Sequence, residues 1–181
     1  NGLGWSSLRP LQEKAIAPIL AGEDVLLLAP TAGGKTEAAI FPLLSRMATE
    51  NWRGLSVLYV CPIKALLNNL LPRLTRHAAA LGRTAAVWHG DTTQGDRRTV
   101  DRDPPDILLT TPESLEVILV SVVRDHNRIL GSLRAIVVDE LHGDAQELDE
   151  FRIRVFLHLG ARGTHGPGLR DLREVRQRLG D

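Results

Sequence analysis

A stretch of small and polar residues at positions 29–36, Ala-Pro-Thr-Ala-Gly-Gly-Lys-Thr, follows an apolar run and opens a segment with helical spacing. Glycines let the backbone turn so that its N–H groups surround phosphate oxygens at the positive end of a helix. In such a loop Lys35 reaches the β and γ phosphates of a nucleotide, and Thr36 holds Mg²⁺. The plain alternative is a glycine-rich strand-to-helix turn with a surface lysine. The residues expected to contact nucleotide in this loop are Thr31, Ala32, Gly33, Gly34, Lys35 and Thr36.

Two adjacent carboxylates, Asp139 and Glu140, end an apolar run that begins at residue 133. Open α/β sheets place their ligands at the carboxyl ends of their strands. Phosphoryl transfer needs one carboxylate to hold Mg²⁺ and a second group to orient or deprotonate water; Asp139 suits the first role and Glu140 the second. Taken alone, an Asp-Glu pair here is more typical of a helix cap. Paired with the loop around Lys35, it favours a site for phosphoryl transfer.

Five near-continuous apolar runs predict strands that are buried on both faces. They span residues 25–30, 57–62, 85–90, 106–112 and 133–140. Segments with helical spacing lie before and between them, at 11–20, 35–49, 63–81 and 113–123. This order predicts an α/β fold with a doubly wound, mainly parallel sheet flanked by helices. The charged stretch 91–105 indicates in part a surface connection.

The character of the sequence changes after His142. Acidic residues dominate as far as Glu150, a glycine-rich stretch covers 160–168, and an arginine-rich end covers 169–181. We interpret these parts as a helix, a link and a short terminal helix. The globular domain is therefore expected to occupy residues 1–159, and residues 160–181 form a divergent or truncated segment.

The bulk composition excludes several classes of protein. Of 181 residues, 43% are hydrophobic and 24% charged, which is typical of one soluble globular domain. Lys and Arg (22) balance Asp and Glu (22), so any basic surface must be local. A single cysteine, Cys61, excludes a disulfide framework and a multi-cysteine metal site and fits a reducing cytoplasm. No apolar run is long enough to span a membrane, so we expect a cytoplasmic protein without membrane contact.

Because residue 1 is Asn and the only methionine is Met47, we also expect the chain to be a fragment of a longer protein.

The motifs, in their order along the chain, resemble those of a known family. The phosphate loop, Pro-Ile-Lys-Ala-Leu at 62–66 and Asp-Glu-Leu-His at 139–142 resemble the first RecA-like domain of superfamily-two helicases, the DEAD/DEAH-box group. Within that group the chain is similar to the Lhr-like branch, through His-Gly-Asp-Thr at 89–92 and Asp-Ile-Leu-Leu-Thr-Thr-Pro-Glu-Ser-Leu at 106–115. The resemblance covers residues 8–142, and the ordered set is far more specific than one motif alone. It implies a RecA-like fold and an ATP-dependent helicase or translocase.

The resemblance also implies roles for single residues, with ATP and Mg²⁺ as cofactors. Lys35 would bind the phosphates, Asp139 would hold the metal with Thr36, and Glu140 would activate water. His142 would couple the nucleotide state to nucleic-acid contacts. Gln12 stands where the family reads adenine, since a carboxamide can donate to and accept from the base edge at once. A solvated helix glutamine is the open alternative.

In this family nucleic acid is held mainly through its phosphate backbone, so the resemblance implies sequence-independent binding of DNA or RNA. Segments that leave strand ends and enter helices can turn free N–H groups toward phosphates. A single junction of this kind is common and often has only a structural role. The presence of several together favours binding of nucleic acid. Aromatic residues, at 4%, offer no stacking platform. The residues expected to contact nucleic acid are Pro62, Lys64, Thr92, Thr110 and Thr111.

Two features depart from the family pattern. No Ser-Ala-Thr triplet follows the acidic box, and no second RecA-like domain, the partner that supplies an arginine to the transferring phosphoryl group, is present in the sequence. A nucleotide- or nucleic-acid-binding fragment without turnover of its own is therefore the alternative to a helicase ATP-binding domain. A small kinase or a transporter ATPase is a remote option, because neither a lid region nor a Leu-Ser-Gly-Gly-Gln signature is found.

Overall fold

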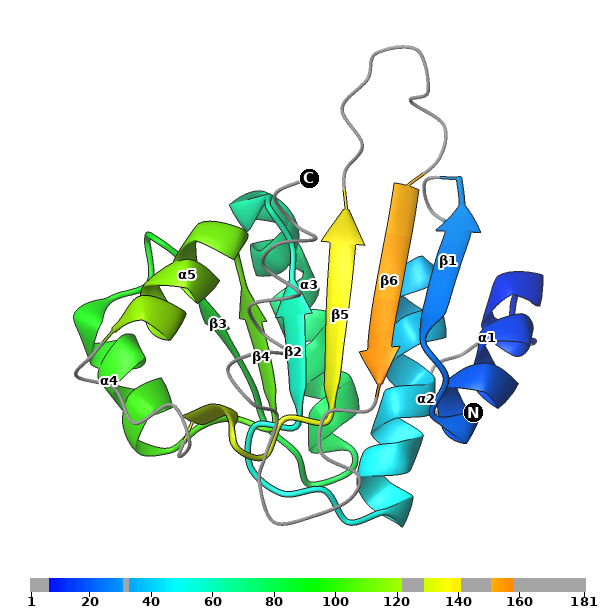
Figure 1. Ribbon diagram of the computed structural model, residues 1–181, viewed down its shortest axis with the longest axis horizontal. Helices are drawn as coiled ribbons and strands as arrows, with labels where there is room; N and C mark the ends of the chain where they lie inside the picture. Colours follow the sequence, from blue (N-terminus) through cyan, green and yellow to red (C-terminus); the bar gives the residue numbers. More distant parts are fainter. Residues whose placement is uncertain (1–6, 31–32, 122–128, 141–150, 158–181) are drawn as a thin grey trace.

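The computed structural model describes residues 7–30, 33–121, 129–140 and 151–157. These residues form helices and strands in alternation (Figure 1). In chain order the elements are α1 (Pro10–Ala21), β1 (Val25–Ala29), α2 (Lys35–Thr49), β2 (Val57–Val60), α3 (Lys64–Ala79), β3 (Ala85–Trp88), α4 (Gln94–Arg102), β4 (Ile107–Thr110), α5 (Pro112–Val120), β5 (Ala135–Glu140) and β6 (Phe151–Leu157).

The strands form one sheet in the order β1-β6-β5-β2-β4-β3. Strands β5, β2, β4 and β3 run parallel, with Tyr59 of β2 in register with Val137 of β5 and Leu109 of β4. Strand β6 runs antiparallel to both of its neighbours, β1 and β5. The α/β class with a mainly parallel sheet is confirmed, and in Figure 1 the arrowheads of β1, β5, β2, β4 and β3 all point to the same edge.

Helices cover both faces of the sheet, because alternate strand residues point to opposite faces and most are apolar. One core lies between the sheet and α1, α2 and α3, and it includes Leu27, Ile40, Leu67 and Val137. The other core lies against α4 and α5. Strand β2 is buried on both faces, whereas β1 is not: Leu26 and Leu28 are 49% and 45% exposed. The prediction that all five runs are buried on both faces is therefore wrong for β1.

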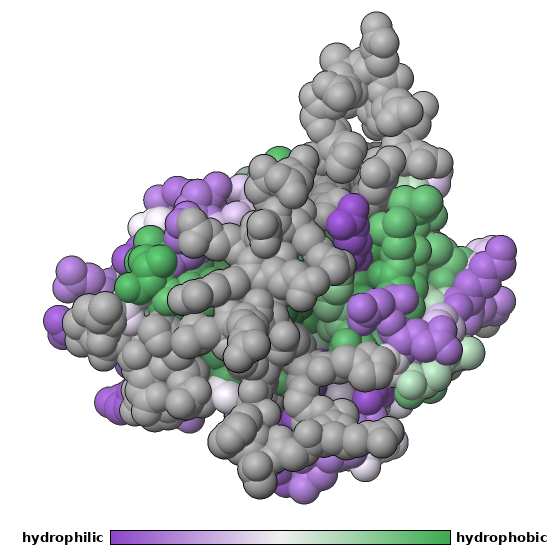
Figure 2. All heavy atoms as spheres, viewed as in Figure 1, coloured by the Kyte–Doolittle hydropathy of each residue, from purple (hydrophilic) through white to green (hydrophobic). Residues whose placement is uncertain are grey.

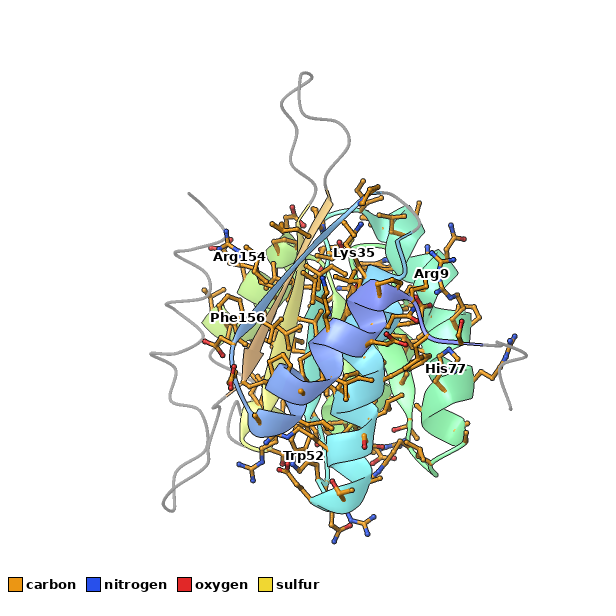
Figure 3. All side chains as sticks on the ribbon, turned by 90° about the vertical axis from the view of Figure 1, so that its right-hand side faces the viewer. Arg9, Lys35, Trp52, His77, Arg154 and Phe156 are labelled. Atoms are coloured by element: carbon orange, nitrogen blue, oxygen red, sulfur yellow. The ribbon has the colours of Figure 1, made fainter. Side chains whose placement is uncertain are left out.

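The exposed leucines of β1 lie on the face opposite α1 and α2, since the intervening Leu27 packs into the core with those helices. Figure 2 shows an apolar area over β1 on the face that also carries α4 and α5. Figure 3 places Arg154 and Phe156 of β6 on the side of the sheet away from α1 and α2. None of the helices in the described part of the chain is long and apolar enough to span a membrane.

Two segments differ from the sequence-based interpretation. Residues 94–102, expected to belong to a surface connection, form α4, whose N-cap hydroxyl on Thr93 accepts a hydrogen bond from the Asp96 N–H at 3.1 Å. Residues 151–157, expected to be helical, form β6. Ile153, Val155 and Leu157 are all at most 4% exposed, so the strand buries every second residue. This alternation of buried residues, with a period of two, is the sequence signal for the strand, and the acidic segment before it obscured the signal.

Candidate nucleotide site and nucleic-acid face

The phosphate loop leaves the end of β1 and enters α2 as the sequence predicts. Gly34 caps α2 with φ +78°, a left-handed conformation that favours glycine. A Cβ atom on Gly34 would lie 2.6 Å from Nε2 of Gln12, and one on Gly33 would lie 2.9 Å from the Pro30 carbonyl oxygen. Gly34 is therefore required by space and by conformation, and Gly33 by space. Thr31 and Ala32 lie outside the described residues.

The side chain of Lys35 turns back into the loop. Its Nζ donates to the carbonyl oxygens of Ala29 at 2.6 Å and Pro30 at 2.8 Å, and the residue is only 8% exposed. Burial lowers the pKa of this ammonium, and the nearby charge of Asp139 acts in the opposite direction. Figure 3 shows Lys35 at the end of the molecule opposite Trp52. The lysine is thus positioned inside the loop and not on the outer surface, which argues against the surface-lysine alternative.

Asp139 lies at the same edge of the sheet. Its Oδ2 accepts a hydrogen bond from the Tyr59 hydroxyl at 2.6 Å. Burial raises the pKa of Asp139, while the Tyr59 hydrogen bond and the Lys35 charge favour its ionised form. Glu140 is the last residue of β5, and its side chain, like the whole of His142, lies outside the described part of the structure. The structure thus brings Lys35 and Asp139 within electrostatic reach of each other, although β6 lies between β5 and the strand β1 that precedes Lys35.

Thr36 is the second residue of α2. Burial raises the pKa of the Tyr59 phenol well above its ordinary value, and the interaction of the phenol with the Thr36 side chain opposes this shift. A hydroxyl and a carboxylate are oxygen donors of the kind that Mg²⁺ takes from a protein while phosphates and waters supply the rest. No cluster of three His, Cys, Asp or Glu side chains occurs within the described ranges. Thr36 and Asp139 therefore fit Mg²⁺ held jointly with a nucleotide better than a metal held by protein alone.

Gln12 lies against the phosphate loop. Its Nε2 donates to the Gly34 carbonyl oxygen at 3.4 Å, and its Oε1 accepts from the N–H of Arg9 at 3.0 Å. The residue is 3% exposed. The alternative of a solvated helix glutamine is therefore wrong, and one carboxamide connects the start of α1 to the start of α2.

A second group of predicted residues surrounds the ends of β2 and β3. Lys64, the first residue of α3, forms an ion pair with Asp91, its Nζ lying 3.0 Å and 3.1 Å from the two carboxylate oxygens. This contact holds the pKa of Asp91 below its usual value. Pro62 is exposed just before α3, and the Thr92 Oγ1 accepts from the His89 N–H at 2.9 Å. The structure thus brings Lys64 and Thr92 together through the turn 89–92.

Thr110 and Thr111 lie at the end of β4, next to that turn, but their hydroxyls are used inside the domain. The Thr110 hydroxyl donates to the Trp88 carbonyl oxygen at 2.7 Å, and Thr110 is 0% exposed. The Thr111 hydroxyl caps α5 by accepting from the Ser114 N–H at 3.3 Å, and Thr111 is 2% exposed. A phosphate contact from this segment would have to use backbone N–H groups at the start of α5.

Several residues that shape these sites were not singled out from the sequence. Tyr59 sits within an apolar run, where an aromatic residue is typical of core packing. Asp91 and His89 belong to the His-Gly-Asp-Thr motif, of which only Thr92 was assigned a contact. His89 accepts from the Asp91 N–H at Nδ1 (3.2 Å) and lies 2.9 Å from Asn68 Oδ1 through Nε2, so it fixes the turn. The motif itself was the signal that could have identified them.

Comparison with known proteins identifies the family. Residues 9–159 match the family model described as DEAD/DEAH box helicase. The chain belongs to the DEAD/DEAH box helicase family. The predicted RecA-like fold is confirmed by its likeness to solved helicase domains, and the predicted similarity to the Lhr-like branch is confirmed by its relatives.

Two curated relatives show the extent of the likeness. The chain is 40% identical over 151 residues to the Lhr helicase/probable uracil glycosylase of Mycolicibacterium smegmatis, a match that covers 75% of this chain and 10% of that protein. It is 35% identical over 147 residues to the ATP-dependent helicase Lhr-Core of Methanothermobacter thermautotrophicus, covering 72% of this chain and 17% of that protein. The chain therefore spans only a small part of the relatives it matches.

Solved structures agree with this assignment. The Mycobacterium smegmatis helicase Lhr bound to ssDNA and AMP-PNP is 38% identical with a TM-score of 0.64, and the match covers 80% of this chain and 20% of that one. The DUF1998 helicase MrfA bound to DNA and AMPPNP is 26% identical with a TM-score of 0.64, covering 77% of this chain and 19% of that one.

Proposed function

We propose that this helicase domain binds Mg²⁺·ATP and, when joined to a second RecA-like domain, couples ATP hydrolysis to movement or strand separation on DNA or RNA. The observation that carries the proposal is the convergence of Lys35, Thr36 and Asp139 at one edge of the sheet, with Gln12 packed against the same loop. Lys35 begins helix α2 and Asp139 lies on strand β5, so a simple strand-to-helix turn does not explain why a lysine and a carboxylate meet there.

Each residue has a defined part in this proposal. Lys35 exchanges its two loop carbonyls for phosphate oxygens, and the N–H groups at the start of α2 surround the same phosphates. Thr36 and Asp139 hold Mg²⁺, which supplies positive charge to the phosphates when it is bound. Glu140 orients or deprotonates the attacking water, and Gln12 reads the adenine edge. His142 links this site to the nucleic-acid contacts.

The nucleic-acid part of the proposal rests on Lys64, the start of α3 and the turn containing Thr92. Ile63, the N-cap of α3, makes no side-chain capping bond, so the first N–H groups of the helix are not satisfied by a cap and can face a phosphate. Pro62 leads the chain into this helix start, and Thr110 and Thr111 hold the neighbouring one. Relatives solved with ssDNA and with DNA support a polynucleotide ligand.

The central test is nucleotide binding by the Lys35→Ala variant, measured by calorimetry with Mg²⁺·ATP. We expect binding to be lost while circular dichroism shows the fold intact, because Lys35 contributes charge and little apolar burial. The matched control is Lys14→Ala, which removes the same charge from an exposed position of α1. Parent-like binding by Lys35→Ala would contradict the assignment of the phosphate loop.

The second candidate function is nucleotide binding without turnover. The observation that favours it is β6, which fills the place between β1 and β5 but carries no Ser-Ala-Thr triplet. Steady-state ATP hydrolysis, measured after a second RecA-like domain is supplied, separates the two functions: turnover supports the helicase domain and its absence supports the binding module.

A further inference from the structure

Tyr59 is a buried phenol at the centre of the nucleotide site. It lies on β2, in register with Val137 of β5, and it is 0% exposed. Its hydroxyl donates to Oδ2 of Asp139 at 2.6 Å, two residues further along β5. The same hydroxyl interacts with the Thr36 side chain. One phenol therefore bonds directly to Asp139 and interacts with Thr36, although these two side chains assigned to Mg²⁺ belong to different elements.

Burying the Tyr59 hydroxyl costs free energy unless the hydroxyl forms a hydrogen bond. Val57 of β2 and Cys61, which directly follows β2, belong to the same core and place no hydroxyl in it. A phenol is protonated at neutral pH, so the Tyr59 hydroxyl is the hydrogen-bond donor to Asp139. A donor fixed at Oδ2 sets the orientation of the carboxylate, and leaves Oδ1 without a hydrogen bond from any described residue.

We propose that Tyr59 is a positioning residue for the metal site, whose hydroxyl holds Asp139 in the orientation in which it binds Mg²⁺ together with Thr36 and the nucleotide. This inference rests on the proposed function, since it assumes that the metal enters with ATP. Groups that orient the ligands of a metal typically change its affinity 10- to 100-fold when they are removed. The alternative is that Tyr59 only fills the core and its hydroxyl takes whichever acceptor is near.

Tyr59→Phe separates these two roles, because it keeps the ring and removes only the hydroxyl. Binding of AMP-PNP to the 181-residue chain is measured by calorimetry while Mg²⁺ is varied, and again in EDTA. We expect the Mg²⁺ concentration for half-maximal binding to rise about 10- to 100-fold in Tyr59→Phe, with unchanged binding in EDTA. A purely structural role would move both measurements together or neither.

Ser56→Ala is the matched control. Ser56 directly precedes the first residue of β2 and is 0% exposed. Its hydroxyl donates to the Gly54 carbonyl oxygen at 2.9 Å. The variant therefore loses a buried hydroxyl next to the same strand, but at the edge of the sheet opposite the proposed nucleotide site. Its Mg²⁺ dependence is expected to match that of the parent chain.

A second measurement does not depend on any variant folding. Tyr59 is the only tyrosine in the sequence, so 3-fluorotyrosine incorporation gives one ¹⁹F resonance. We expect this resonance to shift when Mg²⁺ is added to the AMP-PNP complex of the parent chain. A resonance that ignores Mg²⁺, or an unchanged Mg²⁺ dependence in Tyr59→Phe, would overturn this inference alone. A parent chain that binds no AMP-PNP would overturn the proposed function and, with it, the role of Tyr59.

Discussion

Lys64 shows how a single side chain can be engaged inside the domain and still be available to a ligand. Its ion pair with Asp91 is on the surface, with side-chain exposures of 46% and 70%. Exposed pairs of this kind contribute little to stability and exchange readily with solvent and other anions. A phosphate that approaches the start of α3 therefore competes with the Asp91 carboxylate for the same ammonium.

We predict opposite effects from the two partners of this pair. Lys64→Ala should weaken binding to unrelated single-stranded oligonucleotides about equally and lower the salt slope by roughly one ion contact or less. Asp91→Asn should strengthen binding several-fold, because it frees Lys64 and removes a negative charge that repels phosphate. Fluorescence anisotropy at several salt concentrations, with DNA and with RNA, measures both.

The control for Asp91→Asn is Asp103→Asn, an equal change of charge at an exposed residue beyond the end of α4. If the two variants strengthen binding equally, net charge explains the effect and Lys64 has no specific contact. A preference that changes between oligonucleotide sequences would instead indicate base reading.

At this scale the sequence predicted residues whose chemistry is unusual for their position, and it missed those whose position looks ordinary. Lys35 and Gln12 stand out because a lysine beside glycines and a glutamine in the first turn of an apolar helix belong to recognisable motifs. Tyr59 does not, because an aromatic residue in an apolar strand is the common core pattern. Only the pairing of β2 with β5 brings its hydroxyl to Asp139, a residue 80 positions away in the sequence.

Among the elements, the junction of α1 with the start of α2 depends on one glycine. Gly34→Ala places a Cβ atom 2.6 Å from Gln12 Nε2 in addition to imposing a left-handed conformation on alanine. The conformation alone costs about 1–2 kcal/mol. Because Gln12 is buried against Arg9 and the loop, the clash should displace it, so we predict a larger loss of unfolding free energy together with weaker ATP binding.

Gly82→Ala is the control for this prediction, since Gly82 has φ +65° and nothing within 4 Å of an added Cβ atom. Urea unfolding of both variants measures the two costs, and calorimetry measures ATP affinity. Equal destabilisation by Gly34→Ala and Gly82→Ala, with parent-like ATP binding in both, would mean that Gln12 is not held by this contact.

Strand β6 was misread because the segment before it is acidic and two arginines, Arg152 and Arg154, interrupt its apolar residues. The sheet buries one face of β6 through Ile153 and Val155 between β1 and β5, whose own apolar pattern is strong. Tertiary pairing thus decides the structure of a segment whose local sequence is ambiguous. The strands at 57–60 and 107–110, by contrast, are apolar on both faces and were predicted correctly.

A truncation pair tests the strand. Ile153 is 1% exposed, so Ile153→Ala should cost about 2–5 kcal/mol of unfolding free energy. Leu26→Ala, on the exposed face of the neighbouring β1, should lower the unfolding free energy by no more than about 0.5 kcal/mol. Urea unfolding curves provide the comparison, and similar losses from both truncations would contradict the burial pattern of β6.

For the whole molecule, the balance of 22 basic and 22 acidic residues made bulk charge uninformative about nucleic acid. The fold indicates where such a surface lies, which the composition could not do. Parallel strands bring the phosphate loop, the acidic box and the turns around Lys64 and Thr92 to one edge of the sheet. In our proposal, a second RecA-like domain supplies the arginine that completes the site.

The last prediction concerns that second domain. Arginines supplied to a transferring phosphoryl group contribute on the order of 10³ or more in rate, so the 181-residue chain alone should hydrolyse ATP poorly. Steady-state hydrolysis should rise by about that factor when a second RecA-like domain is supplied.

In the completed protein Glu140→Gln keeps the size and hydrogen bonding of the side chain but removes the carboxylate, so ATP binding should persist while turnover collapses. Glu13→Gln, the same change at an exposed position of α1, should leave turnover unaltered. Unchanged turnover in Glu140→Gln would assign the activation of water to another residue, and a loss of ATP binding would assign Glu140 to the binding of nucleotide.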